Sequence, residues 1–374
     1  MIFFNKPYLS GKETEYIRQA VESGKISGDG LFTKKCHDFF ENKYKFRKCL
    51  LTHSCTAALE MAALLIDTRA GDEIIMPSFT FVSTANAFVL RGAKIVFADS
   101  NPLNPNIDAS QIEQLITPNT KAIVVVHYAG IACDMAKIKE LTDKYHLFLI
   151  EDAAQSIDSY YEDKPLGSLG DFAAFSFHET KNIISGEGGM LVINNDKFIE
   201  RAQIIREKGT NRPAFFRGET DKYQWIDIGS SYLPSEINAA FLFAQLENLD
   251  FIQAKRKSIW SSYYKNLEEL ASNEKIQIPF IPNYASNNAH IFYLLCKNES
   301  ERKKLILFLN KKEIQAIFHY LPLHQSPFYK KYNLISHCPH TERYAATLLR
   351  LPLYYELKSD EIDKISQTIW DFYS

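Results

Sequence analysis

The stretch FSFHETKNIISGEGGML, from Phe175 to Leu191, is the most informative part of this chain for both fold and chemistry. An apolar run ends near Phe177, Lys181 follows in a loop, and a glycine-rich turn leads into the next apolar run. A lysine at a strand end beside such a turn suits Schiff-base chemistry, because its amine can attack a carbonyl group. An isolated lysine of this kind is usually a solvated loop residue, so its interpretation depends on the rest of the chain.

Short apolar runs on both sides of this stretch alternate with helix-like segments. They are rich in β-branched residues and do not alternate polar with apolar positions, which is typical of strands covered by helices on both faces. The runs are EIIM at 73, KIVFAD at 94, AIVVVH at 122, LFLIED at 147, FAAFSF at 172 and MLVINN at 190. The pattern predicts an α/β domain with a largely parallel sheet and a ligand crevice at the carboxyl ends of its strands.

Three segments have helical patterns, two within this domain and one that leads out of it. Ser10-Gly11-Lys12-Glu13 has the form of a capping box and predicts a helix that ends near Gly24. Residues 56–66 are dense in strong helix formers. Residues 235–270 contain hardly a helix breaker and predict one long helix or two abutting ones.

The region beyond Pro279 has a different pattern, with two strand candidates and several helices. The strand candidates begin at 290 and 314, and the helices lie from 300 and near 342 and 359. This order predicts a smaller α+β unit. We therefore expect a large domain over residues 1–240 and a small domain over 241–374 that begins with a long connecting helix.

The composition excludes several classes of protein. The 43 Lys and Arg residues nearly balance the 45 Asp and Glu residues, so no strong basic field would attract nucleic acid or an anionic membrane. The six cysteines include no CxxC pair, and we expect a reducing compartment. The segment His337-Cys338-Pro339-His340 has no second ligand cluster, so we expect no metal. With no signal-peptide pattern and no apolar run near the roughly 18 residues of a membrane span, we expect a cytoplasmic location.

Three further features support a chemical role for Lys181. Asp152 ends an apolar run and could pair with a pyridinium nitrogen, or cap a helix. Residues 52–57 form a polar turn into a helix, whose free N–H groups could hold an anion, or which could be a simple N-cap. Phe81 follows another apolar run and could stack on a planar ring or pack in the core.

Taken together, these residues resemble the DegT/DnrJ/EryC1/StrS family of sugar-nucleotide aminotransferases, within fold type I of the pyridoxal phosphate (PLP) enzymes. The resemblance runs along almost the whole chain. It rests on Thr56-Ala57, Phe81, Asp152-Ala153-Ala154-Gln155, Ser176, and Lys181 followed by Gly186-Glu187-Gly188-Gly189. It implies a fold type I large domain, with a mixed and mostly parallel sheet, followed by a smaller α+β domain. It also implies PLP as the cofactor.

The resemblance also implies a role for each of these residues. Lys181 would attach the cofactor and act as the catalytic base, with Asp152 as the partner of the ring nitrogen. Gln155 would lie near the ring hydroxyl and Phe81 would stack on the ring. The cofactor phosphate would be held by Thr56, Ala57 and Ser176. In many members an asparagine of the neighbouring subunit also reaches the phosphate. Ser231 stands at that position here, so we expect a homodimer with shared active sites in which Ser231 has this place.

Three blocks, FSFHETKN, IIREKGTN followed by FFRGETDKYQW, and DIGSSYL, resemble one subgroup more narrowly. Its members transfer an amino group from L-glutamate to C4 of dTDP-4-dehydro-6-deoxyglucose, giving dTDP-4-amino-4,6-dideoxygalactose. Such sugars enter surface polysaccharides such as lipopolysaccharide and enterobacterial common antigen. The alternatives within the family are amination at C3 or the opposite configuration at C4. A regulator without turnover and a lysine aldolase are further alternatives.

The resemblance suggests a substrate side as well. Tyr320 and His324 lie in a segment that closes over the sugar nucleotide in the family, although the same residues could form a turn packed on the large domain. Arg212 and Arg217 are candidates for binding the pyrophosphate, and a solvated loop is the alternative.

Overall fold

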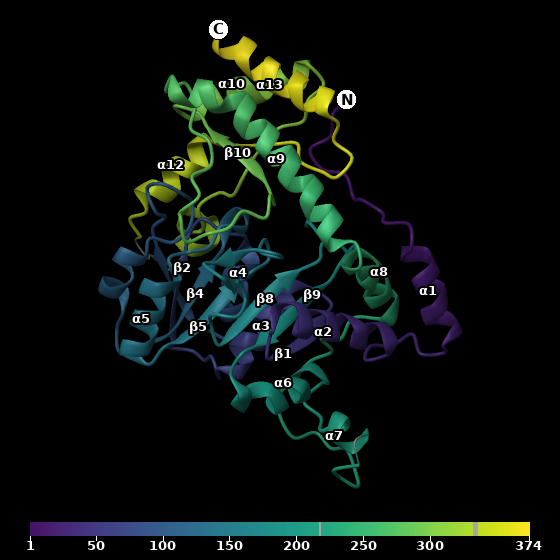
Figure 1. The fold of residues 1–374 in the computed structure, drawn as a ribbon. Helices are drawn as coiled ribbons and strands as arrows, with labels where there is room; N and C mark the ends of the chain where they lie inside the picture. The colour runs from purple at the N-terminus through teal and green to yellow at the C-terminus, as the bar shows by residue number, and fades with distance from the viewer. Residues whose placement is uncertain (217, 332–335) are drawn as a thin grey trace.

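A seven-stranded sheet forms the centre of the larger part of the molecule (Figure 1). The computed structural model describes residues 1–216, 218–331 and 336–374. In spatial order the strands are β1 (Lys48–Thr52), β9 (Gly189–Ile193), β8 (Phe172–Ser176), β5 (Phe148–Asp152), β4 (Thr120–Val126), β2 (Glu73–Pro77) and β3 (Lys94–Ala98). β9 runs antiparallel to β1 and β8, whereas the pairs from β8 to β3 are parallel. The sheet therefore confirms the predicted α/β class.

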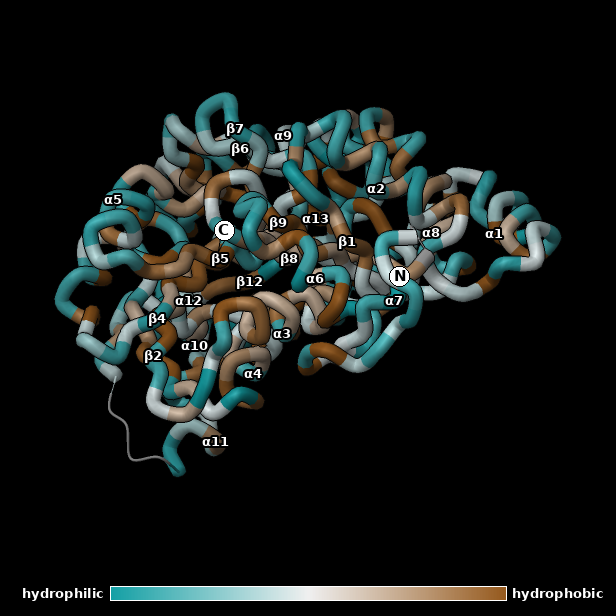
Figure 2. Tube along the Cα trace, turned by 90° about the horizontal axis from the view of Figure 1, so that it is seen from below, coloured by the Kyte–Doolittle hydropathy of each residue, from teal (hydrophilic) through white to brown (hydrophobic). Residues whose placement is uncertain are grey.

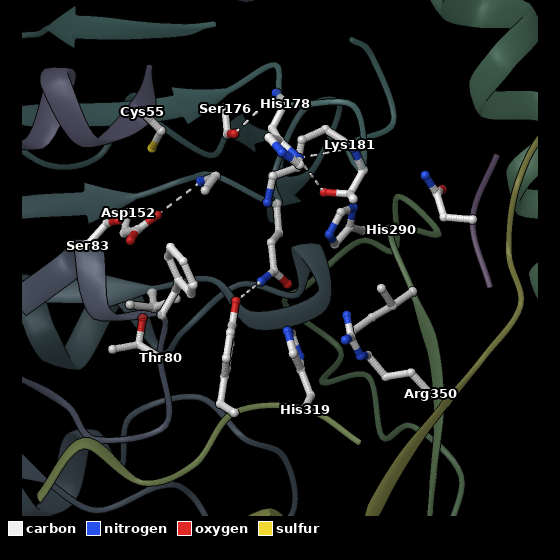
Figure 3. A pocket seen from close by; sticks show the side chains of 18 of the residues that line it. Cys55, Thr80, Ser83, Asp152, Ser176, His178, Lys181, His290, His319 and Arg350 are labelled. Carbon is white, nitrogen blue, oxygen red and sulfur yellow. Dashed lines mark hydrogen bonds between the residues drawn. The ribbon is translucent and has the colours of Figure 1, made fainter. Parts of the chain in front are cut away.

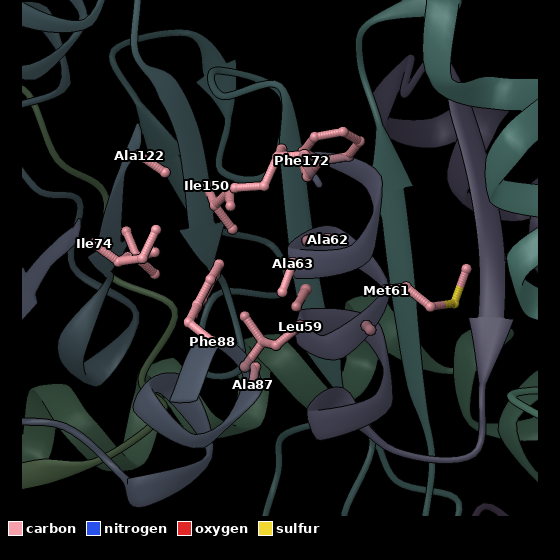
Figure 4. Close-up of a cluster of buried hydrophobic side chains, with 14 of the residues drawn as sticks. Leu59, Met61, Ala62, Ala63, Ile74, Ala87, Phe88, Ala122, Ile150 and Phe172 are labelled. Carbon is pink, nitrogen blue, oxygen red and sulfur yellow. The ribbon is translucent and has the colours of Figure 1, made fainter. Parts of the chain in front are cut away.

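Helices cover both faces of this sheet, which explains why its strands do not alternate polar and apolar residues. The helices are α2 (Leu31–Tyr44), α3 (Cys55–Leu65), α4 (Val82–Val89), α5 (Met135–Tyr145), α6 (Ile199–Arg206) and α8 (Glu236–Leu246). On β4, Val124 packs with the α3 and α4 side, and Val125 packs with the α5 side. Figure 4 shows the first of these clusters, in which Phe88 and Leu59 approach Ile150 from the helices. Burial on both faces selects apolar residues at every position.

The first helix, α1 (Glu13–Glu22), forms as predicted but with half of the expected capping box. The Glu13 carboxylate accepts hydrogen bonds from the N–H groups of Ser10 (2.7 Å) and Gly11 (2.8 Å). The Ser10 hydroxyl instead donates to the carbonyl oxygen of Ala244 (3.3 Å) in α8. A tertiary contact therefore replaces the local cap.

The long helical stretch is two abutting helices, α8 and α9 (Leu249–Ser272). α9 runs from the large sheet to the smaller part of the molecule (Figure 1). Its Ile252 packs in a core beside the large sheet, and its Tyr263 packs in a second core, that of the smaller part. The smaller part has a three-stranded antiparallel sheet of β10 (Phe292–Leu295), β12 (Leu348–Leu351) and β11 (Ile317–Phe318). Its other helices are α10 (Glu299–Lys311), α12 (Pro339–Thr347) and α13 (Ser359–Tyr373).

The N-terminus also belongs to this second core, because Ile2 packs there and pairs with Ile314. The boundary between residues 240 and 241 stays a prediction. The remaining short elements are β6 (Tyr160–Tyr161), β7 (Lys164–Pro165), α7 (Arg212–Phe216) and α11 (Pro327–Lys330). In Figure 2 the central strands are hydrophobic, whereas α1 and α5 at the periphery carry many hydrophilic residues. Among the helices of the described ranges, none is long and apolar enough to cross a membrane.

Candidate active site

A cavity of about 770 Å³ opens between the large sheet and the small sheet (Figure 3). The last residues of three parallel strands line it: Val126 of β4, Asp152 of β5 and Ser176 of β8. The opposite wall comes from the C-terminal part of the chain, including His319 and Arg350. The cavity thus lies at the carboxyl ends of the strands, where the sequence predicted a ligand crevice.

Asp152 is a buried carboxylate with no charged partner in contact. Its Oδ2 accepts a hydrogen bond from Thr84 Oγ1 (2.7 Å), and its Oδ1 accepts one from the Ala154 N–H (3.2 Å). Within the ranges that the structure describes, no ion pair involves it. Burial raises the pKa of the Asp152 carboxyl above its usual value, although both hydrogen bonds act in the opposite direction. A buried carboxylate in this state favours a cationic group on a ligand.

Lys181 reaches the same cavity from the loop after β8. Its backbone N–H donates to the carbonyl oxygen of His178 (2.9 Å), which fixes the turn at the lysine. Burial lowers the pKa of the Lys181 amine, and the Arg350 guanidinium lowers it further, against the opposing effects of Cys55 and Asp152. A lower pKa leaves more of the amine unprotonated, which is the form that attacks a carbonyl group.

The start of α3 forms a cradle for an anion. Ser54 caps the helix, because its Oγ accepts a hydrogen bond from the Ala57 N–H (3.1 Å). The N–H groups of Cys55 and Thr56 lie in the first turn, where the helix itself offers no partner, and the helix dipole favours negative charge there. Thr56 and Ser176 line the cavity, whereas Ala57 is buried behind it with its N–H engaged by the cap. The structure thus places two of the three predicted phosphate residues at the cavity.

Gly189 explains why the glycine-rich turn is needed at this point. It begins β9 directly against the start of α3, and a Cβ atom there would overlap the backbone of Ser54 and Cys55. A side chain at this position would therefore push the strand away from the anion cradle.

Three predicted residues meet on one side of the cavity. Gln155 Oε1 accepts a hydrogen bond from the Ala129 N–H (2.7 Å), and its Nε2 donates to the Tyr320 hydroxyl (3.1 Å). The Tyr320 ring lies 6.4 Å from the ring of Phe81, at 39° to it. Phe81 keeps 57% of its surface exposed at the cavity, so its face is free to stack on a planar ligand.

His324 does not line this cavity. It is buried at the other side of its segment, with Nδ1 2.7 Å from Ser78 Oγ and Nε2 3.1 Å from Glu342 Oε1. The structure therefore gives this segment the geometry of a turn packed on the large domain, and a substrate role for His324 stays a prediction.

Arg212 and Ser231, predicted for the pyrophosphate and for the partner subunit's site, also lie away from the cavity. Arg212 begins α7, on an arm that projects from the large sheet (Figure 1), with its Nη1 3.7 Å from Glu207 Oε2. Ser231 is exposed and forms an isolated β-bridge with Glu207. Arg217 lies outside the described residues. The roles of all three stay predictions.

Sequence reasoning missed a second group of cavity residues, which come from the small domain and from α9. Arg350 of β12 lies over the Phe4 ring (4.8 Å) and donates from Nη2 to the carbonyl oxygen of Phe318 (3.3 Å), while its buried Nε has no partner in the described structure. His290, His319 and Arg256 share the cavity wall. No local motif marks these residues, because the contact between the two domains brings them to the cavity.

The residues that meet in this cavity fit the cofactor that the resemblance implies. A buried carboxylate suits the ring nitrogen, and the Lys181 amine suits the aldehyde. The α3 cradle suits the phosphate, and the exposed Phe81 face suits the ring. The ring nitrogen, the aldehyde, the phosphate and the ring face of PLP therefore each have a complementary group at the cavity.

Comparisons with known proteins agree with this geometry. A model of the DegT/DnrJ/EryC1/StrS aminotransferase family matches residues 7–370. GDP-perosamine synthase of Escherichia coli O157:H7 is 32% identical over 371 residues, which cover 99% of this chain and 98% of that protein. The spore coat polysaccharide biosynthesis protein SpsC of Bacillus subtilis is 29% identical over 377 residues, 98% of this chain and 96% of its own length. The aminotransferase TlmJ of Streptoalloteichus hindustanus superposes with a TM-score of 0.91 at 26% identity, covering 100% and 99% of the two chains.

Proposed function

The chain belongs to the DegT/DnrJ/EryC1/StrS aminotransferase family and is a PLP-dependent sugar aminotransferase, and on this premise we propose that it aminates C4 of dTDP-4-dehydro-6-deoxyglucose. The amino donor is L-glutamate, and the product is dTDP-4-amino-4,6-dideoxygalactose. The meeting of Lys181, Asp152 and the α3 cradle in one cavity supports the transamination. The blocks FSFHETKN and DIGSSYL support the choice of sugar. The name of the B. subtilis relative supports a place in surface polysaccharide synthesis.

The position of each side chain supports its proposed role. PLP, when bound, supplies an electron sink and a carrier for the amino group. Lys181 Nζ attaches the cofactor and, when free, takes and returns the proton at the carbon atoms that react. The Asp152 carboxylate keeps a proton on the ring nitrogen. Gln155 and Phe81 orient the ring, and Thr56 and Ser176 hold the phosphate, with Ala57 supporting the helix start.

Arg350 is proposed as the anchor for a carboxylate of the amino donor. Its guanidinium lines the cavity, and within the described ranges no carboxylate pairs with it. An uncompensated cation in a cavity favours an anionic ligand over a neutral amine, because the ligand replaces the lost solvation. This charge supports an amino acid donor such as glutamate.

The proposed assembly is a homodimer in which Ser231 reaches the phosphate of the partner subunit. The segment that leads to Ser231 is apolar and exposed in the single chain, with Trp225 at 83%, Ile226 at 51% and Ile228 at 46% of their surface. Exposed apolar residues gathered on one segment favour burial against another protein surface. Arg212 lies on the same arm, and Arg212 and Arg217 are proposed to face the sugar nucleotide's pyrophosphate in that assembly. Tyr320 and His324 remain candidates for the sugar side.

The experiment that tests this function is product identification by NMR. The purified protein, PLP and L-glutamate are incubated with dTDP-4-dehydro-6-deoxyglucose, with the corresponding 3-ketosugar, and with GDP-4-dehydro-6-deoxymannose. We expect conversion of the first substrate, with the new C4 amine axial. Amination at C3, an equatorial C4 amine, or selective use of the GDP sugar would each contradict the proposed substrate while leaving the family assignment intact.

A further inference from the structure

A buried polar cluster stands directly behind Lys181 and has no role in the function proposed above. Asn182, the residue after the lysine, is its centre. The Asn182 Nδ2 group donates to Gln253 Oε1 of α9 (2.8 Å) and to the carbonyl oxygen of Asn288 (2.9 Å). Its Oδ1 faces His290 Nδ1 at 2.8 Å. The lysine turn is thereby joined to the connecting helix and to the segment that enters β10.

The orientation of both amides in this cluster is determined by their partners. Gln253 Nε2 faces Asp158 Oδ2 and the carbonyl oxygen of Asn288, both at 3.4 Å, and neither of these can donate. Gln253 Oε1 therefore faces Asn182, and the Asn182 amide must present its NH2 group to Gln253 and its oxygen to His290. An amide oxygen only accepts hydrogen bonds, so His290 Nδ1 must carry a proton.

The charge of His290 follows from its surroundings. Burial lowers the pKa of its imidazole well below the usual value, and the cations of Lys181, Arg256 and Arg350 lower it further, with His319 as the remaining titratable neighbour. A neutral imidazole with its proton on Nδ1 has a lone pair on Nε2.

The backbone holds this ring in place. The His290 N–H donates to Asn288 Oδ1 (3.0 Å), and its carbonyl oxygen accepts a hydrogen bond from Arg256 Nη2 (2.7 Å). Nε2 has no partner in the described part of the chain, and His290 lines the cavity on the same wall as Lys181 (Figure 3). A fixed acceptor therefore faces a space that otherwise carries the donors of Lys181, Arg256 and Arg350.

We propose that His290 is a positioning residue for Lys181, in which Asn182 fixes the imidazole tautomer and Nε2 is the acceptor to which the unattached lysine amine can turn. The inference rests on the proposed function of Lys181. It gives the amine a fixed orientation between its two roles of attachment and proton transfer. The other charged or titratable groups that face Lys181 are Asp152 of β5, Cys55 of α3 and Arg350 of β12.

Titration of the Lys181 amine tests this proposal without any turnover. The cofactor-free full chain is labelled with a trace of acetic anhydride over a pH series, and acetylation of the Lys181 peptide is measured by mass spectrometry. Two variants separate the ring atoms: His290→Asn ends near Nδ1 and keeps the donor to Asn182, whereas His290→Gln reaches the place of Nε2 with an acceptor. Thermal melts check that both variants fold.

We expect His290→Asn to lower the pKa of Lys181 by about one unit, a tenfold change in the protonation ratio, because an acceptor for the ammonium is lost. His290→Gln should stay within about half of that shift. A parental pKa in His290→Asn, or equal shifts in both variants, would overturn the proposal.

A second measurement uses the parent protein and avoids any question of folding. In protein labelled with ¹⁵N-histidine, the Nε2 shift of His290 should have the value of an unprotonated ring nitrogen and the Nδ1 shift that of a protonated one. The opposite tautomer would refute the role of Asn182. Neither experiment contains donor or sugar, so failure here is distinct from failure of the parent protein to transfer an amino group.

Discussion

Replacing Asp152 with Asn removes one charge from the cavity while leaving its hydrogen bonds almost unchanged. Asn Oδ1 can accept the Ala154 N–H, and Asn Nδ2 can donate to Thr84 Oγ1. The Thr84 hydroxyl can then turn its proton to Thr80 Oγ1, which lies 2.8 Å away. The fold should therefore tolerate the variant. The loss is the electrostatic support of the ring nitrogen, so kcat should fall by about 10²–10³, or about 2.7–4 kcal/mol in the barrier.

The stability of the cofactor-free protein gives an independent check, because the substitution that lowers kcat should not lower the melting temperature. Burial raises the folded pKa of Asp152, so between the unfolded and folded pKa values the folded protein holds more protons than the unfolded chain. Stability must then fall as pH rises through this interval. Asp152→Asn removes this cost, and its cofactor-free melting temperature at pH 7 should equal or exceed that of the parent, with the difference vanishing below about pH 3.9.

The assays are single-turnover kinetics with glutamate and calorimetric melts, with Asp171→Asn as a matched control. Asp171 lies at the other end of the same sheet and does not line the cavity. Its Oδ2 accepts a hydrogen bond from the Leu149 N–H (3.0 Å). That variant should keep nearly parental kcat. Turnover of Asp152→Asn at the parental rate, or destabilisation of its cofactor-free form by several kcal/mol, would refute the electrostatic role of Asp152.

Three further predictions concern the cavity wall and the assembly. Arg350→Gln should raise the KM for glutamate about tenfold or more and leave the KM for the sugar within about twofold, because one charge-assisted hydrogen bond is lost; equal changes in both constants would contradict the assignment. Tyr320→Phe removes the acceptor of Gln155 Nε2 and should lower cofactor affinity about fivefold in fluorescence titration, and an unchanged affinity would place the ring elsewhere. Lys181→Ala and Ser231→Glu homodimers should each be inactive, but after mixing should recover about a quarter of the parental activity, since half the dimers are mixed and one of two sites in each is native. No recovery after confirmed subunit exchange would show that Ser231 serves its own subunit.

The large sheet could be predicted from the sequence because burial on both faces selects a continuous apolar run in each strand. Runs such as AIVVVH and LFLIED correspond to β4 and β5 within a residue or two. β1 and β12 were not predicted, because CLLT and LLRL are short and could equally belong to helices.

Only part of the candidate site could be predicted from the sequence. Lys181, Asp152 and the turn before α3 follow strand ends or begin a helix, so local sequence patterns predict their positions. His290, Arg256 and Arg350 reach the cavity only because the small domain folds back on the large one. Ala57 shows the converse limit, because the sequence could not reveal that Ser54 takes its N–H.

Attachment of the cofactor to Lys181 can be tested by chemical reduction. The purified protein with PLP bound is reduced with borohydride and digested, and the peptide that carries the reduced cofactor is sequenced by mass spectrometry. We expect a single labelled peptide with the cofactor on Lys181, and no covalent label in Lys181→Ala, which should still bind PLP. A cofactor fixed to any other lysine, or an undiminished label in Lys181→Ala, would show that Lys181 does not attach the cofactor.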